Sequence, residues 1–244
     1  MIIMRNSLTM AEAGWCNGSE SDEKEHHVDE FDLQQTDRLL TTTRAVRKRL
    51  DLTRPVPPAL ITECLNIATQ APSGSNAQRW RFMVVTDPDK KQTIGSYYQK
   101  SFAEYIAPKQ DAIAGDPHSM KITASATFLA EHLGEVPAIV IPCVLDRPPA
   151  SDDGEAKAGF WGGILPAVWS FQLALRSRGL GSAWTTLHLN HELEVGELLG
   201  IPDTVTQVAL LPVAYYTGDT FQPAKRRPIE QLTYWDTWKH TLEF

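Results

Sequence analysis

The sequence predicts a globular fold of mixed helices and strands. In several segments apolar residues recur at helical spacing, whereas residues 82–86, 137–145 and 205–215 form shorter, mostly apolar runs typical of strands. Hydrophobic residues make up 42% of the 244 residues and charged residues 22%, as in ordinary soluble proteins. The apolar runs are too short or too interrupted to span a membrane, and no secretory signal is visible at the N-terminus. We therefore expect no membrane segment.

Charge and cysteine content narrow the class of protein further. The net charge is −7, and residues 1–36 contribute −6 of it, so we interpret them as an acidic, mobile extension and residues 37–244 as the folded domain. An acidic balance argues against nucleic acid as a partner, while clustered arginines suggest one small anionic ligand. Cys16, Cys64 and Cys143 form no metal-binding pattern and are typical of reduced thiols in a cytoplasmic protein.

The first predicted helix runs from Asp37 towards Val46 and leads into a basic cluster at residues 44–49. In a helix, Arg44 and Arg47 would share one face. Two guanidinium groups on one face suit a phosphate, because each can donate parallel hydrogen bonds to its oxygens. A solvated basic surface is the other interpretation.

A second helix, beginning at Pro57 or Pro58, delivers the chain to the turn-rich stretch 71–82, which a strand over 82–86 then follows. Hydroxyls, amides and open backbone N–H groups at a strand end often bind ligands. The same residue types also occur in any helix-to-strand loop. After Asp87 the pattern predicts helices at 88–97, 101–113 and 121–133.

The second half of the domain begins with residues 137–145, whose continuous apolar run predicts a central strand buried on both faces. Residues 159–178 predict a helix that is apolar nearly all round, buried in the fold or in a subunit interface. Pro166 can start or kink that helix, and Gly179 suits its cap. Gly179 and Gly181 would let the backbone approach something flat, or simply connect a cap to a strand.

A helix is expected to follow from Asn190, as N-cap, to Leu199. Pro212 within the strand 205–215 predicts an edge position or a bulge. The second basic cluster, residues 225–227, precedes Pro228. If Pro228 starts a helix, these cations lie at its N-terminus and oppose the helix dipole unless an anion lies between them.

Four segments, taken in order, resemble the flavin-dependent nitroreductase family over residues 37–234. They are Arg44 to Arg47, the pattern Ala-Pro-Ser-x-x-Asn-x-Gln-x-Trp-x-Phe at 71–82, Gly-Leu-Gly-Ser leading to Trp-Thr-Thr at 179–186, and Lys-x-Arg-Pro at 225–228. No dinucleotide fingerprint or P-loop competes with them. The resemblance implies an α+β fold with a mostly antiparallel sheet flanked by helices, an intertwined homodimer, and FMN at the subunit interface.

The resemblance further implies which residues hold the FMN. They are Arg44, Ala45, Arg47, Ser73, Asn76, Gln78, Thr185, Thr186, Lys225 and Arg227. The first arginine and the late basic pair would bind the phosphate, and the second arginine would reach the pyrimidine edge of the flavin ring. The serine, asparagine and glutamine would come from the partner subunit, and the two threonines would lie along the ring.

Two positions depart from the family pattern. Ala45 stands where a serine is common, so one hydroxyl is absent near the cofactor, and Arg79 stands where proline is common. Arg79 either faces solvent or selects an acidic substrate.

The implied activity is hydride transfer from NADH or NADPH to FMN, followed by reduction of a nitroaromatic, quinone or similar small acceptor. No catalytic side chain or metal is required, because the flavin carries the chemistry. The alternatives on this scaffold are a dehalogenase, a biosynthetic dehydrogenase or an oxygen-dependent enzyme that fragments FMN. A non-catalytic flavin-binding protein is a further alternative. Residues 97–135 and 147–158 would form the substrate side and decide among them.

Overall fold

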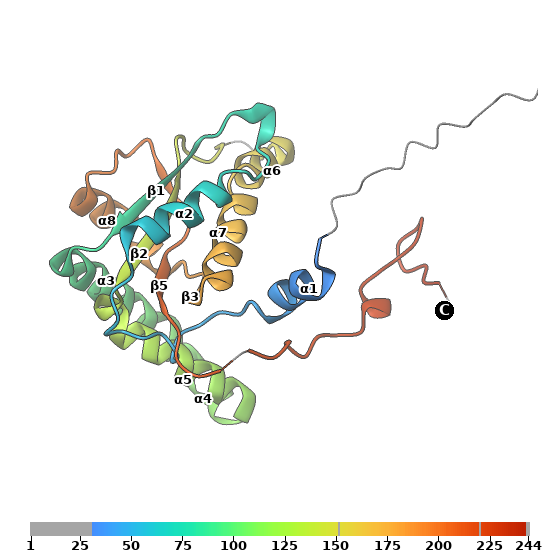
Figure 1. The fold of residues 1–244 in the computed structure, drawn as a ribbon, viewed down its shortest axis with the longest axis horizontal. Helices are drawn as coiled ribbons and strands as arrows, with labels where there is room; N and C mark the ends of the chain where they lie inside the picture. Colours follow the sequence, from blue (N-terminus) through green and yellow to red (C-terminus); the bar gives the residue numbers. More distant parts are fainter. Residues whose placement is uncertain (1–30, 151, 220, 243–244) are drawn as a thin grey trace, which may run out of the picture. The chain divides into compact units, whose positions relative to one another are not determined.

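A computed structural model describes residues 31–150, 152–219 and 221–242 of the chain (Figure 1). Leu33–Phe244 form one compact unit. The predicted acidic extension lies outside the described residues as far as residue 30, and Cys16 lies there too. The first helix, α1, spans Leu33–Thr42, so helical structure begins within the segment that was assigned to the extension.

A five-stranded antiparallel sheet organises the fold (Figure 1). The strands are β1 (Trp80–Val85), β2 (Ala138–Val144), β3 (Leu180–Ser182), β4 (Thr206–Gln207) and β5 (Leu211–Tyr215). They are ordered β1-β2-β5-β3, with β4 paired to β2, and every paired strand is antiparallel to its neighbour. The predicted α+β class is confirmed.

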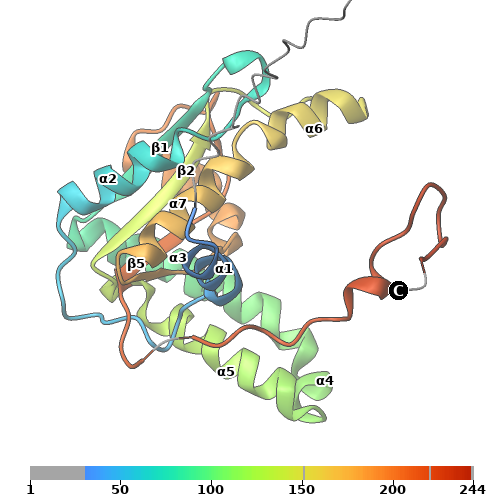
Figure 2. The same ribbon diagram turned by 45° about the vertical axis from the view of Figure 1, so that its right-hand side comes forward.

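Strand β2 lies at the centre and all seven of its residues are buried, as predicted. Its side chains alternate between the two faces of the sheet and pack into two separate hydrophobic cores. Val140 and Val144 pack with α2 (Pro58–Ala68) and α7 (Leu165–Ser177), whereas Ile139 and Ile141 pack with helices on the opposite face. Those helices are α3 (Pro88–Ile106), α5 (Pro117–His132) and α8 (Glu192–Leu199). Helices therefore cover both faces of the sheet (Figure 2).

The structure corrects the placement of Pro212. This residue pairs with Ile139 inside the sheet, so β5 is not an edge strand. The ladder between β5 and β3 begins only at Val213. Between the Ser182–Val213 pair and the Thr185–Leu210 pair, β5 makes no ladder bonds with the β3 side. Pro212 lies in this interval, so its missing N–H breaks no ladder bond.

Several helix boundaries differ from the predicted ones. Residues 98–100 lie inside α3 because Ile94, Tyr98 and Phe102 form one continuous buried face. The Lys90 N–H donates to the Asp87 carboxylate at 2.9 Å, which confirms the predicted helix start. The 3₁₀ turn Ala107–Lys109 and the short helix α4 (Gln110–Ala114) follow α3.

The apolar stretch at 159–178 forms two helices, α6 (Gly154–Gly162) and α7, and Pro166 lies in the first turn of the second. Gly179 has φ +75°, which suits the predicted cap. By length and composition alone, Gly154–Ser177 is the one described stretch that could cross a membrane. Its second half, α7, packs on α2 and β3, as expected of a core helix. Asn190 falls inside the 3₁₀ segment Leu187–His191, so His191, and not Asn190, precedes α8.

Candidate functional site

The first basic cluster does not lie on a helix: residues 44–46 run alongside β3, and residues 47–49 form a turn. Helix α1 ends at Thr42, Ala45 pairs with Ser182 of β3, and the Val46 N–H donates to the Ser182 carbonyl at 2.8 Å. The predicted continuation of the helix to Val46 is therefore wrong, and Arg44 does not share a helical face with the next arginine. Burial of the Val46 side chain and pairing to β3 replace the helical bonds that are lost.

Gly181 makes this pairing possible. A Cβ atom at position 181 would lie 2.9 Å from the Val46 Cβ, which is closer than real Cβ contacts allow. The glycine thus accommodates a neighbouring valine within the same chain, rather than a flat ligand. Its role is to hold the segment that carries the first basic cluster against β3.

The chain that follows β5 contacts Arg44 three residues before it reaches the second basic cluster. The Arg44 guanidinium donates to the Gln222 carbonyl at 3.0 Å, and Lys225 and Arg227 follow a few residues later, both exposed. No helix begins at Pro228, because Ile229–Gln231 form only one 3₁₀ turn. Ile229 is 66% exposed, so no packing supports a longer helix there. The predicted helix N-terminus is wrong, and the cations lie on extended chain.

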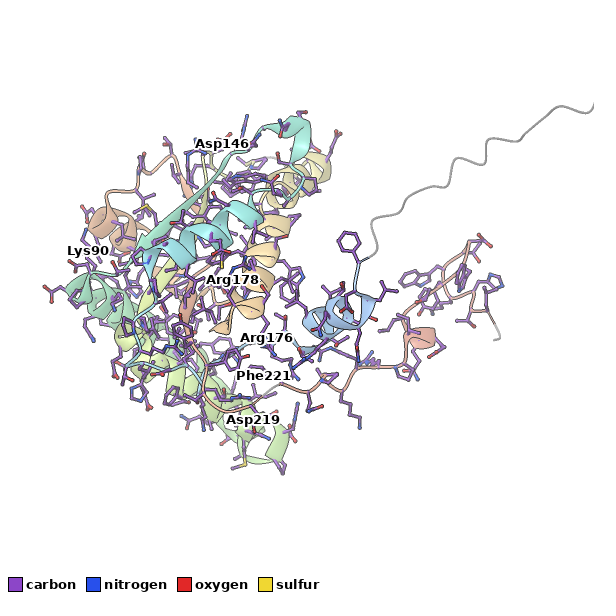
Figure 3. All side chains as sticks on the ribbon, viewed as in Figure 1. Lys90, Asp146, Arg176, Arg178, Asp219 and Phe221 are labelled. Carbon is purple, nitrogen blue, oxygen red and sulfur yellow. The ribbon has the colours of Figure 1, made fainter. Side chains whose placement is uncertain are left out.

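Two arginines anchor the start of this C-terminal segment. The Arg49 guanidinium lies 4.1 Å from the Phe221 ring centroid, and that of Arg176 lies 5.0 Å from the same centroid. Tyr216 packs edge-on against Phe221 with ring centroids 5.0 Å apart, and both guanidinium groups also contact the Tyr216 ring. Figure 3 shows Arg176 beside Phe221. Stacking of this kind fixes the segment beside residues 44–49.

Arg47, Thr185 and Thr186 line one pocket of about 450 Å³, together with side chains of α3, α5 and the α3–α5 connection. Thr185 is buried, and its hydroxyl donates to the Leu210 carbonyl at 2.8 Å. Thr186 is exposed at the start of the next 3₁₀ segment. Burial raises the pKa of Tyr98, and a hydrogen bond with Thr185 acts in the other direction. The tyrosine is therefore a neutral wall of the pocket.

The loop that holds Ser73, Asn76 and Gln78 has an uncommon conformation. Ser75 and Asn76 have φ +51° and Gln78 has φ +46°, a left-handed region that is sparsely populated by residues other than glycine. Internal bonds hold this shape: the Gln78 N–H donates to the Ser73 hydroxyl at 3.3 Å, and the Gln78 side-chain amide donates to Asn76 Oδ1 at 2.9 Å. Such strain clusters at functional sites. Ser73 and Gln78 line a second pocket, of about 350 Å³, against α6.

The two groups of predicted cofactor residues lie at different ends of β2. The loop leads into Trp80, which pairs with Val144 at the last residue of β2. Ala45 pairs with Ser182 of β3, and Ser182 pairs with Val213 of β5. Val213 in turn pairs with Ala138, the first residue of β2. A seven-residue strand is about 20 Å long. Figure 1 likewise shows the loop before β1 and the segment after α1 at opposite ends of the sheet. A single chain therefore does not bring Ser73 and Asn76 to Arg44.

Arg79 has a partner in the structure. Its guanidinium pairs with the Asp146 carboxylate at 2.7 Å, and both side chains are more than half exposed. Arg79 therefore faces solvent at the edge of the α6 pocket. An exposed pair of this kind adds little stability.

The residues present suit an FMN cofactor. Among the described residues, no carboxylate forms an ion pair with Arg44, Arg47, Lys225 or Arg227. The Arg44–Gln222 bond ties Arg44, a side chain suited to phosphate, to the segment that leads to Lys225, and Arg47 borders a pocket that can receive part of a ring. The donor set thus matches a molecule with a phosphate at one end and an electron-accepting ring at the other.

Tyr98 and Phe102 are buried core residues of α3, and the sequence indicates no further role for them. They also line the Arg47 pocket, as do Tyr105, Lys109 and Trp184. The sequence did predict that residues 97–135 form the substrate side, which includes most of these pocket residues. No spacing in the sequence indicates which of their side chains face Arg47.

Comparison with known proteins shows which family this fold belongs to. The model of the nitroreductase family matches residues 40–215. Iodotyrosine deiodinase 1 of Rattus norvegicus is 27% identical over 198 residues, which cover 80% of this chain and 67% of the rat protein. The chain spans 61% of the human counterpart. An NADH dehydrogenase of Thermus thermophilus is 28% identical over 219 residues, covering 83% of this chain and all of that protein.

A solved structure of oxidised iodotyrosine deiodinase bound to FMN and 3-iodo-L-tyrosine superposes with a TM-score of 0.63 at 25% identity. The match covers 82% of this chain and 98% of that one. The chain belongs to the nitroreductase family. The resemblance drawn from its sequence motifs is thereby confirmed.

Proposed function

We propose that this protein is an FMN-dependent oxidoreductase that takes reducing equivalents from NADH or NADPH and passes them to a small organic acceptor. The observation that carries the proposal is the pocket that Arg47 shares with Thr185 and Thr186, which lies a few residues along the chain from Arg44. Arg44 is bonded to the segment that bears Lys225 and Arg227. Arg47, Thr185 and Thr186 border a pocket of about 450 Å³, which can receive part of the flavin ring.

The proposed cofactor-binding residues have distinct roles. Arg44, Lys225 and Arg227 hold the phosphate, because guanidinium and ammonium groups form short, charge-assisted bonds to its oxygens. Arg47 places a fixed positive charge where negative charge develops on reduction. Thr185 and Thr186 lie along the ring, while Ala45 leaves space without contributing a hydroxyl.

When bound, FMN accepts a hydride and returns two electrons to the acceptor, so the protein needs no catalytic triad or metal. With a nitroaromatic acceptor, NAD(P)H, one proton and the nitro compound give NAD(P)⁺, the nitroso compound and water. The side chains bind, orient and shield the reactants.

The proposed unit is a cytoplasmic homodimer. Ser73, Asn76 and Gln78 are about a strand's length from Ala45 within one protomer. A second copy can supply that loop to the cofactor, and the partner loop then completes the site. The exposed aromatic groups of the C-terminal segment, including Trp235 and Trp238, offer an apolar surface for the same association.

Reductive removal of halogen from an aromatic ring is a second candidate. It is favoured by the similarity to iodotyrosine deiodinases from several organisms and by the aromatic lining of the Arg47 pocket. The balance is simple: NAD(P)H and the aryl halide give NAD(P)⁺, the arene and a halide ion. Release of halide from a halogenated phenol, measured against reduction of a nitroaromatic, separates the two candidates.

The absorbance spectrum of the purified protein with FMN tests the proposal. We expect bound flavin, loss of its visible absorbance on addition of NADH or NADPH without oxygen, and recovery on addition of a nitroaromatic or quinone. A protein that binds no FMN would refute the proposal. Bound flavin that no reductant bleaches would instead indicate a flavin-binding protein without turnover.

A further inference from the structure

The Arg47 pocket is basic and aromatic. Its 450 Å³ are enclosed by residues of three parts of the chain. The aromatic members are Tyr98, Phe102, Tyr105 and Trp184. The charged members are Arg47 and Lys109, and none of the lining residues is acidic.

Lys109 is the cation that the proposed cofactor does not use. It ends the 3₁₀ turn after α3, and its ammonium group lies 3.1 Å from the centroid of the Tyr105 ring. Among the described residues, no carboxylate lies within ion-pairing distance of it. The ring face stabilises the ammonium group, yet it satisfies none of its hydrogen-bond donors as an anion would.

Two hydroxyl-bearing residues of α5, Ser119 and Thr123, also line this pocket, one helical turn apart. The Ser119 hydroxyl donates to the Asp116 carboxylate at 2.6 Å. Tyr105 is half exposed, so the pocket is open to solvent on this side. The arrangement has an aromatic interior beside Arg47 and a basic, hydroxyl-bearing mouth at Lys109.

We propose that the electron acceptor of this enzyme is an aromatic compound with an anionic substituent, such as a carboxylate or phenolate. Its ring packs among the aromatic side chains, and its anion pairs with Lys109. This inference rests on the proposed function, because the acceptor is defined only relative to a flavin beside Arg47. A cationic or strongly basic acceptor is disfavoured, since the lining offers it no carboxylate.

The charge of the acceptor is tested with 4-nitrobenzoate and 4-nitrobenzamide, which have nearly the same shape. The flavin-loaded protein should show a kcat/KM about tenfold higher for the benzoate, as expected for one partly desolvated charge pair. Raising the ionic strength should lower the value for the benzoate more than that for the amide. Lys109→Gln should reduce the ratio of the two kcat/KM values about tenfold.

Lys90→Gln is the matched control. Lys90 lies near the other end of α3 (Figure 3) and lines none of the pockets described above, so its loss should leave the ratio unchanged. Equal kcat/KM values for the two acceptors in the wild-type protein, or an unchanged ratio in Lys109→Gln, would overturn this inference and leave the proposed function standing. Absence of bound FMN and of turnover with both acceptors would overturn the two together.

Discussion

His188 is a buried side chain whose protonation opposes folding. It has no exposed surface, and neither ring nitrogen has a hydrogen-bond partner among the described residues. Burial lowers its pKa from 6.5 to about 4, and the nearby Glu192 only partly opposes this. The imidazole is therefore neutral in the folded state at neutral pH.

The stability of the protein should therefore fall as the solution becomes acidic. Between about pH 6.5 and 4 the unfolded chain binds a proton at His188 that the folded protein excludes. The free energy of unfolding should fall by roughly 1.4 kcal/mol per pH unit in this window from this group. Denaturant unfolding of wild type and His188→Leu at pH 7 and pH 5 measures this contribution. The leucine variant should lose about 2 kcal/mol less over that interval.

His118→Gln is the control for this measurement, because His118 is exposed on α5. It should follow the wild-type decline. An equal decline in His188→Leu and wild type would show that other groups dominate the acid sensitivity.

A single guanidinium group should matter for cofactor affinity. Arg44→Ala removes a charged donor to the proposed phosphate, which should weaken FMN binding by about one to two orders of magnitude. Arg38→Ala, on the exposed surface of α1, should bind FMN as wild type does. Titration of the apoprotein with FMN, followed by flavin fluorescence, gives both dissociation constants. Equal affinity of Arg44→Ala and wild type would remove Arg44 from the site.

At the level of elements, the site depends on one contact between a strand and a segment without regular structure. The residues from Arg44 to Arg47 are held by β3 through Val46 and Gly181. Gly181→Ala places a methyl group 2.9 Å from the Val46 Cβ, so one of the two backbones must move. We expect a loss of about 1–3 kcal/mol of stability and weaker FMN binding.

Gly159→Ala provides the matched comparison for that variant. An added Cβ at this position of α6 meets no atom within 4 Å, and alanine favours a helix over glycine by up to about 1 kcal/mol. This variant should be at least as stable as wild type. Thermal unfolding measures the stability of both variants, and titration with FMN measures their cofactor affinity. A Gly181→Ala protein that melts and binds FMN like wild type would contradict the role given to the Gly181–Val46 contact.

At the level of the whole molecule, the split between the two groups of cofactor residues can be tested by complementation. One variant carries Arg44→Ala and Arg47→Ala, and the other carries Ser73→Ala and Asn76→Ala. Each alone should bind FMN poorly. In a dimer that shares its sites, a mixed pair contains one site with all the substitutions and one with none, so about a quarter of all sites should recover in a one-to-one mixture.

Unfolding and refolding the mixture, or expressing both chains together, allows the protomers to exchange. Recovery of tight FMN binding, counted by flavin absorbance per chain, is the expected result. No recovery, despite mixed dimers detected by differently sized tags, would mean that both groups of residues act within one chain.

Much of the fold could be predicted from the sequence because local patterns report it directly. The continuous apolar run of β2, the Asp87 cap of α3 and the left-handed Gly179 are each specified by neighbouring residues. The ordered motifs likewise led to the family. The interpretation of Cys64 and Cys143 as reduced thiols agrees with the structure, because both are buried and free and burial raises the pKa of Cys143 to about 12.

Only the tertiary structure decided how the site residues are held and grouped. The sequence by itself determined the residue types of the proposed site: clustered arginines, a polar loop before a strand and two threonines after a glycine turn. The end of α1 at Thr42 depends on Val46 finding a buried place beside Gly181, more than a hundred residues away. The separation of Ser73 from Ala45 likewise follows from strand register. Such contacts join distant parts of the chain, and no local pattern encodes them.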